Sequence, residues 1–341
     1  MGTLKEIADK CKVSTATVSK ALNDHRDISD ETKKLVRKVA KEMNYFPNAN
    51  ARALKTRRTY NIGVLFEDEA KNGLTHDYFA SVLDSFKRTV EKQGYDLTFV
   101  NTNIEGRNGL SLVEHCRYRG FDGVMIACMD FDDKQIQELI SSKIPVVIID
   151  YIAMGRISVV SDNISGIRDL LTYVYNMGHR KVAYVHGDDS AVSRDRVYSF
   201  KKTAQRLGLK IPNKYYIEAP YRIMTASQNA TAALLDLPDP PTCIFYPDDD
   251  AAFGGMNEIN ERGLSIPDDI SIAGYDGIRI GRHIKPELTT LRQDTETIGE
   301  KAGEKLISLI ENPKGTKIEE VIVKGEVFEG NTVKDIRKKK S

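Results

Sequence analysis

Cysteine, long apolar runs and enzyme motifs are scarce or missing in this chain of 341 residues. Its four cysteines are widely spaced and form no C-x-x-C pair, which argues against a disulfide framework and favours a reducing compartment, the cytoplasm. The longest apolar runs, such as PVVII, are too short to cross a bilayer, and charges occupy the N-terminal positions where a signal peptide needs apolar residues. We therefore expect a cytoplasmic protein with no membrane partner.

Motifs for catalysis and cofactor binding are also absent. The sequence contains no G-x-S-x-G elbow, no Walker loop, no G-x-G-x-x-G fingerprint and no H-E-x-x-H pair. The run Asp248 to Asp250 lacks the glutamate that would complete a calcium loop. His179 and His186 are expected to be structural. The sequence thus predicts neither an enzyme nor a cofactor or metal site.

The formal net charge of +1 is unevenly distributed. Residues 1–60 hold 14 Lys and Arg against 7 Asp and Glu, a net charge of +7, so the other 281 residues hold 36 against 42, a net charge of −6. A basic block on an acidic body is typical of a small module that meets a polyanion beside a larger body with another task. A merely solvated N-terminus is the simpler alternative.

Three short amphipathic helices are predicted in the basic block. Thr3 and Glu6 have the spacing of a capping box, and Ser14 and Ser29 are suitable N-caps for the second and third helices. Apolar residues recur at helical spacing after each cap and are expected to form a small core. They are Leu4, Ile7, Ala8 and Cys11, then Val18, Ala21 and Leu22, then Leu35, Val39, Ala40 and Met43.

The stretch STATVSKALN, residues 14–23, leaves Thr15, Ala16, Ser19 and Lys20 on the outer face of the second helix. Small polar groups let a helix backbone approach another surface closely, and a helix N-terminus favours phosphate. Two helices joined by a tight turn, the second with such a face, describe a helix-turn-helix with its recognition helix. A plain three-helix bundle is the alternative.

A further short helix is predicted after Pro47, from the cap Asn48 to about Lys55. A helix of this length is marginal in water, because nucleation is costly below about 12–15 residues. Its alanines permit close approach of a second copy, and Leu54 is its one large apolar residue. We expect this segment to become ordered only when something packs against it.

From Asn61 onward, short β-branched runs alternate with amphipathic stretches. This alternation predicts parallel sheets covered by helices on both faces, and the seven runs exceed one compact sheet. We therefore expect two similar lobes that divide near residues 160–163. The runs are NIGVLF, DLTFVN, GVMIAC, PVVIID, KVAYVHG, CIFYP and SIAGYD.

Acidic, basic and aromatic residues gather directly after these strands. In such folds ligands bind beyond the carboxyl ends of the strands, which for two lobes means the cleft between them. Asp and Arg bond vicinal hydroxyls in pairs, while an aromatic ring stacks on the apolar face of a sugar, so a polyol or sugar site is predicted. Its expected residues are Asp77, Phe79, Asp130, Asp150, Arg194, Arg196, Tyr221, Asp248 and Asp276.

The motifs and their order resemble the lactose-repressor/galactose-repressor family of bacterial transcription regulators. The matching stretches include TLKEIADKCKVSTATVSKALN, YFPNANARALK, GHRKVAYV, IFYPDDDAAFGGM, GLSIPDDISIAGYDG and PELTTLRQD. The resemblance implies an α/β fold: a helix-turn-helix head with a hinge helix, then a two-lobed, doubly wound domain like that of periplasmic sugar-binding proteins. The implied domains are 1–47, 48–60 and 61–341, with lobes of about 61–160 plus 291–320 and 161–290 plus 321–333.

The resemblance also implies roles for individual residues in DNA binding. Thr15, Ala16 and Lys20 would read base edges in the major groove, and Leu54 from each of two paired hinge helices would wedge open the central base step. Lys20 stands where many members have arginine, and lysine lacks the bidentate fork of arginine. Backbone or groove contacts are expected from Ser14, Thr17, Ser19, Asn23, Asn48, Arg52 and Lys55.

In the larger domain the resemblance assigns the ligand-binding arginine to Arg196 and the aspartate of the GYD motif to Asp276. Asp248 stands where asparagine is frequent, which suits a ligand with more hydroxyls or a cationic group. Asp249 and Asp250 are more simply interpreted as acids that interact with a helix N-terminus.

We therefore predict a homodimeric repressor of carbohydrate-utilisation genes, released from a near-palindromic, double-stranded operator by a sugar-like effector. The chain lacks the leucine heptads by which some relatives form tetramers. One alternative is a regulator whose DNA binding is promoted by a corepressor or a phosphoprotein partner. Another is a solute-binding protein, against which the DNA-reading head and the missing signal sequence argue.

Overall fold

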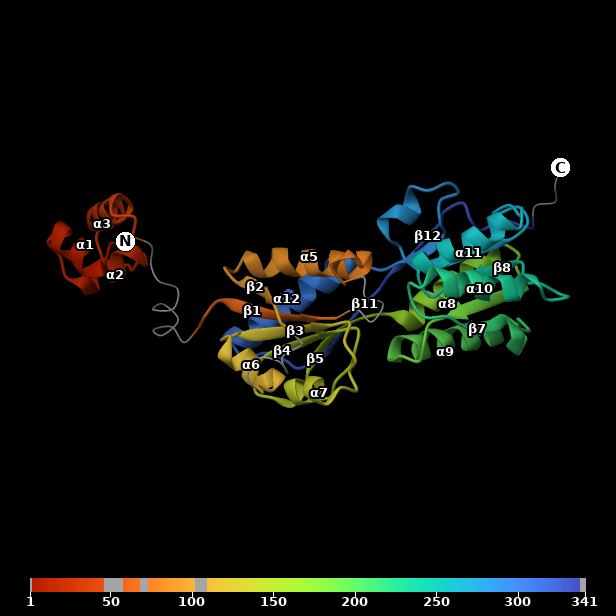
Figure 1. Cartoon of the computed structure of the whole chain (residues 1–341), viewed down its shortest axis with the longest axis horizontal. Helices are drawn as coiled ribbons and strands as arrows, with labels where there is room; N and C mark the ends of the chain where they lie inside the picture. The colour runs from red at the N-terminus through yellow and green to blue at the C-terminus, as the bar shows by residue number, and fades with distance from the viewer. Residues whose placement is uncertain (1, 46–57, 68–72, 102–108, 338–341) are drawn as a thin grey trace. The chain divides into compact units, whose positions relative to one another are not determined.

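The structure, a computed structural model, describes residues 2–45, 58–67, 73–101 and 109–337. They belong to two compact units, Met1–Thr59 and Tyr60–Ser341 (Figure 1). The predicted hinge helix, with Asn48, Arg52, Leu54 and Lys55, lies outside the described residues. Within those residues, no helix is both long enough and apolar enough to cross a membrane.

The described residues of the first unit form three helices around a small apolar core. Thr3 and Glu6 form the predicted capping box, and the hydroxyls of Ser14 and Ser29 accept hydrogen bonds from amides in the first turns of the second and third helices. The helices are α1 (Leu4–Cys11), α2 (Thr15–Leu22) and α3 (Asp30–Glu42).

One predicted core position in α3 is wrong. Leu35 is 47% exposed, whereas its neighbour Val36 is fully buried together with Val39 and Ala40. Adjacent helical residues point about 100° apart, so only one of the two can face α1 and α2, and the packed face passes through Val36.

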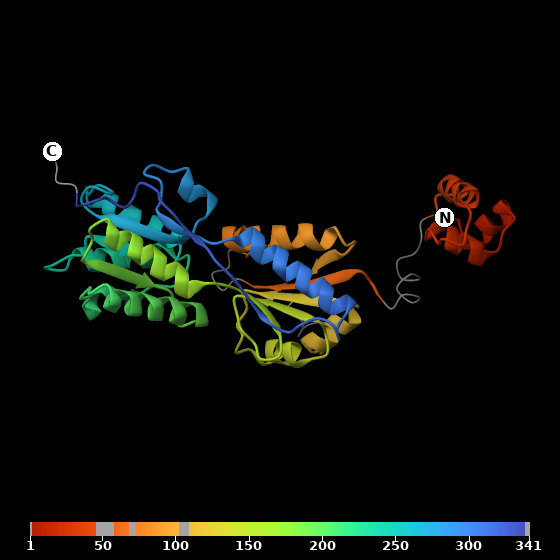
Figure 2. The same cartoon turned by 180° about the vertical axis from the view of Figure 1, so that it is seen from behind.

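The first lobe of the larger unit is a six-stranded parallel sheet in the order β11-β5-β4-β3-β1-β2. Two helices cover each face (Figures 1 and 2). The strands are β1 (Asn61–Phe66), β2 (Asp96–Phe99), β3 (Gly123–Ala127), β4 (Val146–Ile149), β5 (Ile157–Ser161) and β11 (Glu320–Val323). The helices are α5 (Asp77–Glu91) and α12 (Thr295–Glu311) on one face, and α6 (Leu112–Tyr118) and α7 (Lys134–Ser141) on the other.

The second lobe repeats this architecture in the order β12-β10-β9-β8-β6-β7, with only β12 antiparallel to its neighbour among the described pairings. The strands are β6 (Val182–His186), β7 (Tyr216–Glu218), β8 (Cys243–Phe245), β9 (Ser271–Asp276), β10 (Thr290–Arg292) and β12 (Glu326–Phe328). The helices are α8 (Asn163–Asn176) and α9 (Ala191–Arg206) on one face, and α10 (Met224–Leu235) and α11 (Asp249–Glu261) on the other. Within the described residues, Gly73–Thr75, Asn213–Tyr215 and Arg279–Arg282 each form a single-turn 3-10 helix.

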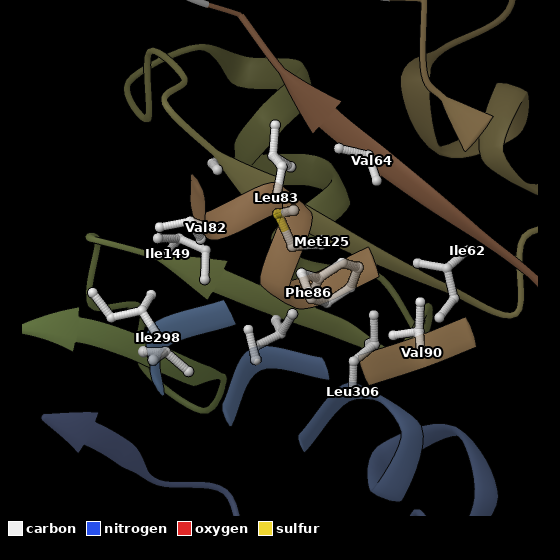
Figure 3. Close-up of a cluster of buried hydrophobic side chains, with 14 of the residues drawn as sticks. Ile62, Val64, Val82, Leu83, Phe86, Val90, Met125, Ile149, Ile298 and Leu306 are labelled. Carbon is white, nitrogen blue, oxygen red and sulfur yellow. The ribbon is translucent and has the colours of Figure 1, made fainter. Parts of the chain in front are cut away.

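The central strands of each sheet bury their two faces in different layers, because successive side chains of a strand point to opposite sides. Ile62 and Val64 of β1 pack with α5 and α12, whereas Leu65 packs with α6 and α7. Figure 3 shows the first of these clusters, where side chains from β1, β3, α5 and α12 meet. Burial on both faces explains why the strands read as continuous apolar runs in the sequence.

The chain crosses between the lobes three times, after β5, after β10 and after β11. The amide of Asp162 in the first crossing donates to the carbonyl oxygen of Val323 in the last, at 2.8 Å. Two crossings differ from the expected boundaries: β10 pairs with β9 through Arg292, and β11 pairs with β5 through Val323. The sequence misplaced them because these short strands are specified by pairing partners distant in the chain.

Candidate effector cavity and DNA-reading helix

A cavity of about 440 Å³ lies between the two lobes of the larger unit. It is built at the carboxyl ends of the strands, where the polar residues of both sheets converge. The first lobe contributes residues from the start of α5 and from the segments after β3 and β4, and the second contributes those after β6, β7, β9 and β10. This is the place that the alternating pattern predicted.

Arg196 is the fixed cation of the cavity. It lies on α9 and is only 4% exposed. Its Nε donates to Oδ1 of Asn163 at 2.8 Å, its Nη1 donates to the carbonyl oxygen of Pro247 at 2.9 Å, and the guanidinium lies 3.6 Å from the centre of the Tyr275 ring. These contacts hold a planar donor group in one orientation before any ligand arrives.

Asp276 and Asp150 are two of the carboxylates that line the cavity, one from each lobe, and both have a positive φ, 100° and 55°. Nε2 of Gln293 donates to Asp276 at 2.6 Å, and the hydroxyl of Tyr78 donates to Asp150 at 2.6 Å. Burial raises the pKa of Asp276 to about 7, against the opposing effect of Arg196. Burial likewise raises the pKa of Asp150.

Asp276 should therefore make stability depend on pH. The unfolded chain loses this proton near the ordinary value of 3.8 and the folded chain near 7, so the folded state binds more protons in between and stability falls as pH rises. Between pH 5.5 and 8 the loss is about 2 kcal/mol. We expect Asp276→Asn to remove this part of the pH dependence in urea unfolding at the two pH values.

Asp195, an exposed aspartate on α9 of the same lobe, provides the control for this prediction. Asp195→Asn should leave the pH dependence as it is in the wild type. Equal pH dependence in the wild type and the Asp276→Asn variant would show that this carboxyl titrates at the same pH in the folded and unfolded chains.

Aromatic rings line both lobes of the cavity. In the first lobe, Phe131 and Tyr151 are stacked with their centres 4.0 Å apart and their planes within 4°. Phe79 meets Tyr78 edge to face at 4.9 Å. In the second lobe the hydroxyl of Tyr221 lies 2.8 Å from Oγ of Ser193. Flat apolar faces beside buried polar groups suit a ligand that has hydroxyls around a ring.

Five of the nine predicted residues line this cavity: Phe79, Asp150, Arg196, Tyr221 and Asp276. Two others stand one position away from the lining. Asp77 is exposed on the first turn of α5, while Tyr78 and Phe79 turn inward. Asp130 is exposed and its Oδ1 accepts from the amide of Asp132 in the turn after β3, while Met129 lines the cavity.

The remaining two, Arg194 and Asp248, also lie outside the lining. Arg194 donates to Asp189 at 2.8 Å with its side chain 64% exposed. Asp248 is buried, but its oxygens accept from the amides of Ala251, in the first turn of α11, and of Arg222. Asp248 thus positions Arg222, which does line the cavity.

Asp249 is more than an acid at a helix N-terminus. It is fully buried and accepts from the amide of Ile278 at 2.8 Å and the hydroxyl of Thr290 at 2.7 Å. These bonds tie α11 to the segments that follow β9 and begin β10, so Asp249 supports the loop that carries Asp276.

Several lining residues were not predicted from the sequence: His76, Phe131, Tyr151, Arg222 and Gln293. Two of them, Phe131 and Tyr151, follow strands directly, so the rule that ligands meet strand ends could have found them. Gln293 could not be found this way, because its strand, β10, has only three residues and no clear apolar run.

The first unit presents α2 as the predicted recognition helix. Its Thr15 and Ala16 are exposed, and Ser19 and Lys20 are half-buried. Ser14 accepts from the amide of Thr17 at 3.0 Å. Capping thus occupies the Ser14 hydroxyl as an acceptor, while the outer face of the helix keeps the small side chains that close approach requires.

Lys20 is engaged within its own unit. Its Nζ lies 2.5 Å from Oδ2 of Asp27, in the turn that follows α2. Nearby, Asp24 bonds Arg37 at 2.9 Å and Lys33 at 3.2 Å. This acidic turn sets the direction of the Lys20 side chain and keeps the pKa of Asp27 below its ordinary value, chiefly through the hydrogen bond from Lys20.

Comparisons with known proteins match both units. Residues 3–48 match the family "Bacterial regulatory proteins, lacI family", and residues 171–333 match a periplasmic binding protein-like domain. The probable transcriptional repressor ExuR of Bacillus subtilis strain 168 is 30% identical over 337 residues, which cover 98% of this chain and 99% of that protein.

Solved structures share the fold. The lac repressor dimer bound to operator and the anti-inducer ONPF is similar, with a TM-score of 0.82 and 22% identity over 98% of this chain and 99% of that one. A lacI-family regulator from Enterococcus faecium with bound ribose has a TM-score of 0.69 and 25% identity over 81% and 99%. On this fold and this relationship, the chain belongs to the lacI family and is a transcriptional repressor with a DNA-binding helix-turn-helix, not an enzyme.

Proposed function

We propose that this repressor is controlled by a sugar or sugar derivative bound in the cavity between its lobes. The observation that carries the proposal is the combination of a fixed guanidinium, Arg196, with Asp276 and Asp150 and with aromatic rings in both lobes. Hydroxyls on neighbouring carbons can bond such charged groups in pairs, while the ring faces cover the carbons. The Enterococcus relative with bound ribose adds support for this ligand class.

A ligand in this cavity touches both lobes, so it favours whichever arrangement of the lobes lets both sets of contacts form. It can shift the equilibrium only by its difference in affinity for the two arrangements, typically about 1–3 kcal/mol. The three crossings between the lobes let one lobe move against the other without breaking a sheet.

On the DNA side, we propose that Thr15, Ala16 and Lys20 read base edges, with Ser14, Thr17, Ser19 and Asn23 around them. The chain would act as a homodimer whose two recognition helices meet successive major grooves of a near-palindromic operator. The segment 48–55 would pair with its copy in the minor groove through Leu54. Effector binding would separate the paired segments and release the DNA.

A thermal-shift screen of the purified chain tests the effector class. We expect a sugar or sugar derivative among monosaccharides, disaccharides, sugar acids and sugar phosphates to raise the Tm by several degrees, because a ligand at 100 times its Kd stabilises by about 2.7 kcal/mol. The same ligand should weaken operator binding in fluorescence anisotropy. Stabilisation by a purine and by none of the sugars would refute the class, and tighter operator binding would establish a corepressor instead.

A further inference from the structure

The edge of the first lobe where its parallel strands begin carries a row of exposed cations. All six strands start there, since the sheet is parallel throughout. The larger unit begins at this edge with Tyr60, one residue before β1, and α6 ends there (Figure 1). The exposed cations just before the strands are Lys92, Arg117, Arg119, Lys143 and Lys314.

Hydrogen bonds hold Tyr60, the first residue of the larger unit, at this edge. The amide of Tyr60 donates to Oδ2 of Asp122 at 2.8 Å, and the amide of Asp96 donates to the carbonyl oxygen of Tyr60 at 2.8 Å. Asp122 follows Arg119 by three residues, in the turn that closes α6. The turn bearing Arg117 and Arg119 therefore lies beside the entry of the chain into the lobe.

None of these five cations forms an ion pair within the part of the chain that the structure describes. Asp96 and Glu320, exposed at the starts of β2 and β11, are acids of the same edge, and three further acids nearby are occupied. Glu91 pairs with Lys87, Asp122 bonds Tyr60, and Glu319 pairs with both Lys305 and Lys317. Tyr118 stands 78% exposed between the two arginines. An edge of this kind has the charge and the donors that a phosphate backbone requires.

We propose that this basic edge, defined by Lys92, Arg117, Arg119, Lys143 and Lys314, binds phosphates of the duplex that the helix-turn-helix reads. Covalent connection favours DNA as the occupant over any other polyanion. Residues 46–59 join the edge to the DNA-reading unit, and a stretch of that length spans at most about 50 Å. The edge gives affinity without sequence information, because phosphates are the same at every base pair.

The test compares the double variant Arg117→Gln/Arg119→Gln with the wild type on two 40-bp duplexes. One carries an operator selected in vitro from random sequence, and the other carries random sequence. We expect the variant to bind both duplexes about tenfold more weakly at moderate salt, and to lower the slope of log K against log salt by about 2. The ratio of operator affinity to random-duplex affinity should stay unchanged. Damage to the recognition helix would instead lower this ratio, because that helix contacts the bases.

Lys210 and Lys214 offer a matched control, since they are exposed at the corresponding edge of the second lobe, before β7. Lys210→Gln/Lys214→Gln removes the same charge and should leave affinity and salt slope as in the wild type. The proposal fails if this control loses as much affinity as the arginine variant, or if the arginine variant keeps the wild-type salt slope. An unchanged Tm of both variants excludes a loss of folding.

Discussion

Arg196→Ala is expected to abolish the response to effector while operator binding persists. Truncation removes the two charge-assisted hydrogen bonds that orient the guanidinium, to Asn163 and Pro247, together with the guanidinium itself. The remaining N–H groups of the guanidinium can donate two hydrogen bonds to hydroxyls of a ligand. Each hydrogen bond to a charged group is worth about 1.5–3 kcal/mol, so we expect effector affinity to fall by about 10²- to 10⁴-fold. Calorimetric titration with the ligand found by thermal shift measures the loss directly.

Arg194 lies two residues earlier on the same helix and makes this experiment specific. Its guanidinium is exposed and bonds Asp189, so Arg194→Ala should leave effector affinity within about twofold of the wild type. Arg196→Lys should fall between the two, because it retains the charge and loses the planar fork. If Arg194→Ala weakened effector binding as much as Arg196→Ala, the cavity described here would not be the effector site.

Gly299→Ala is expected to destabilise the first lobe by about 3 kcal/mol, the upper part of the range for overpacking. Gly299 lies on α12 where it crosses α5, and a Cβ there would stand 2.4 Å from the carbonyl oxygen of Val82 and 2.7 Å from the amide nitrogen of Phe86. These are backbone atoms that cannot rotate away, so one helix must move. Urea unfolding followed by circular dichroism measures the change.

Gly281→Ala is the matched control for the helix crossing. Gly281 is also buried, but the nearest atom to its Cβ would be 3.5 Å away, an ordinary van der Waals contact. We expect its effect on the free energy of unfolding to stay below about 1 kcal/mol. Equal effects of the two substitutions would mean that α5 and α12 separate without cost.

Local signals in the sequence were sufficient for the helix caps of the first unit and for seven of the twelve strands that the structure describes. The caps Thr3, Ser14 and Ser29 are where the pattern placed them, because capping depends on residues within one turn. Each of the seven apolar runs contains a strand. For the central strands, burial on both faces demands such continuous apolar residues. The prediction of a helix-turn-helix head with a two-lobed α/β body is confirmed by the family and the fold.

The direction of individual side chains was beyond the sequence. Leu35 and Val36 are both apolar, and only contact with α1 and α2 selects Val36. Asp77 and Tyr78 both stand at the start of α5, and only the orientation of that helix against the sheet turns Tyr78 toward Asp150. In each case the sequence limits the site or core position to two or three adjacent residues, and tertiary packing determines which of them points inward.

By itself, then, the order of residues determined the capped helices of the first unit and the seven strands with apolar runs, and it indicated that strand ends would supply the polar groups of a site. Only the tertiary structure decided which polar groups meet: it placed Gln293 against Asp276 and Asn163 against Arg196, and used Asp248 to hold the backbone of Arg222. The physical reason is the sequence separation of the interacting residues. Capping and periodicity act within a few residues, whereas these partners are 17, 33 and 26 positions apart and come together only when the strands pair and the helices pack on the sheets.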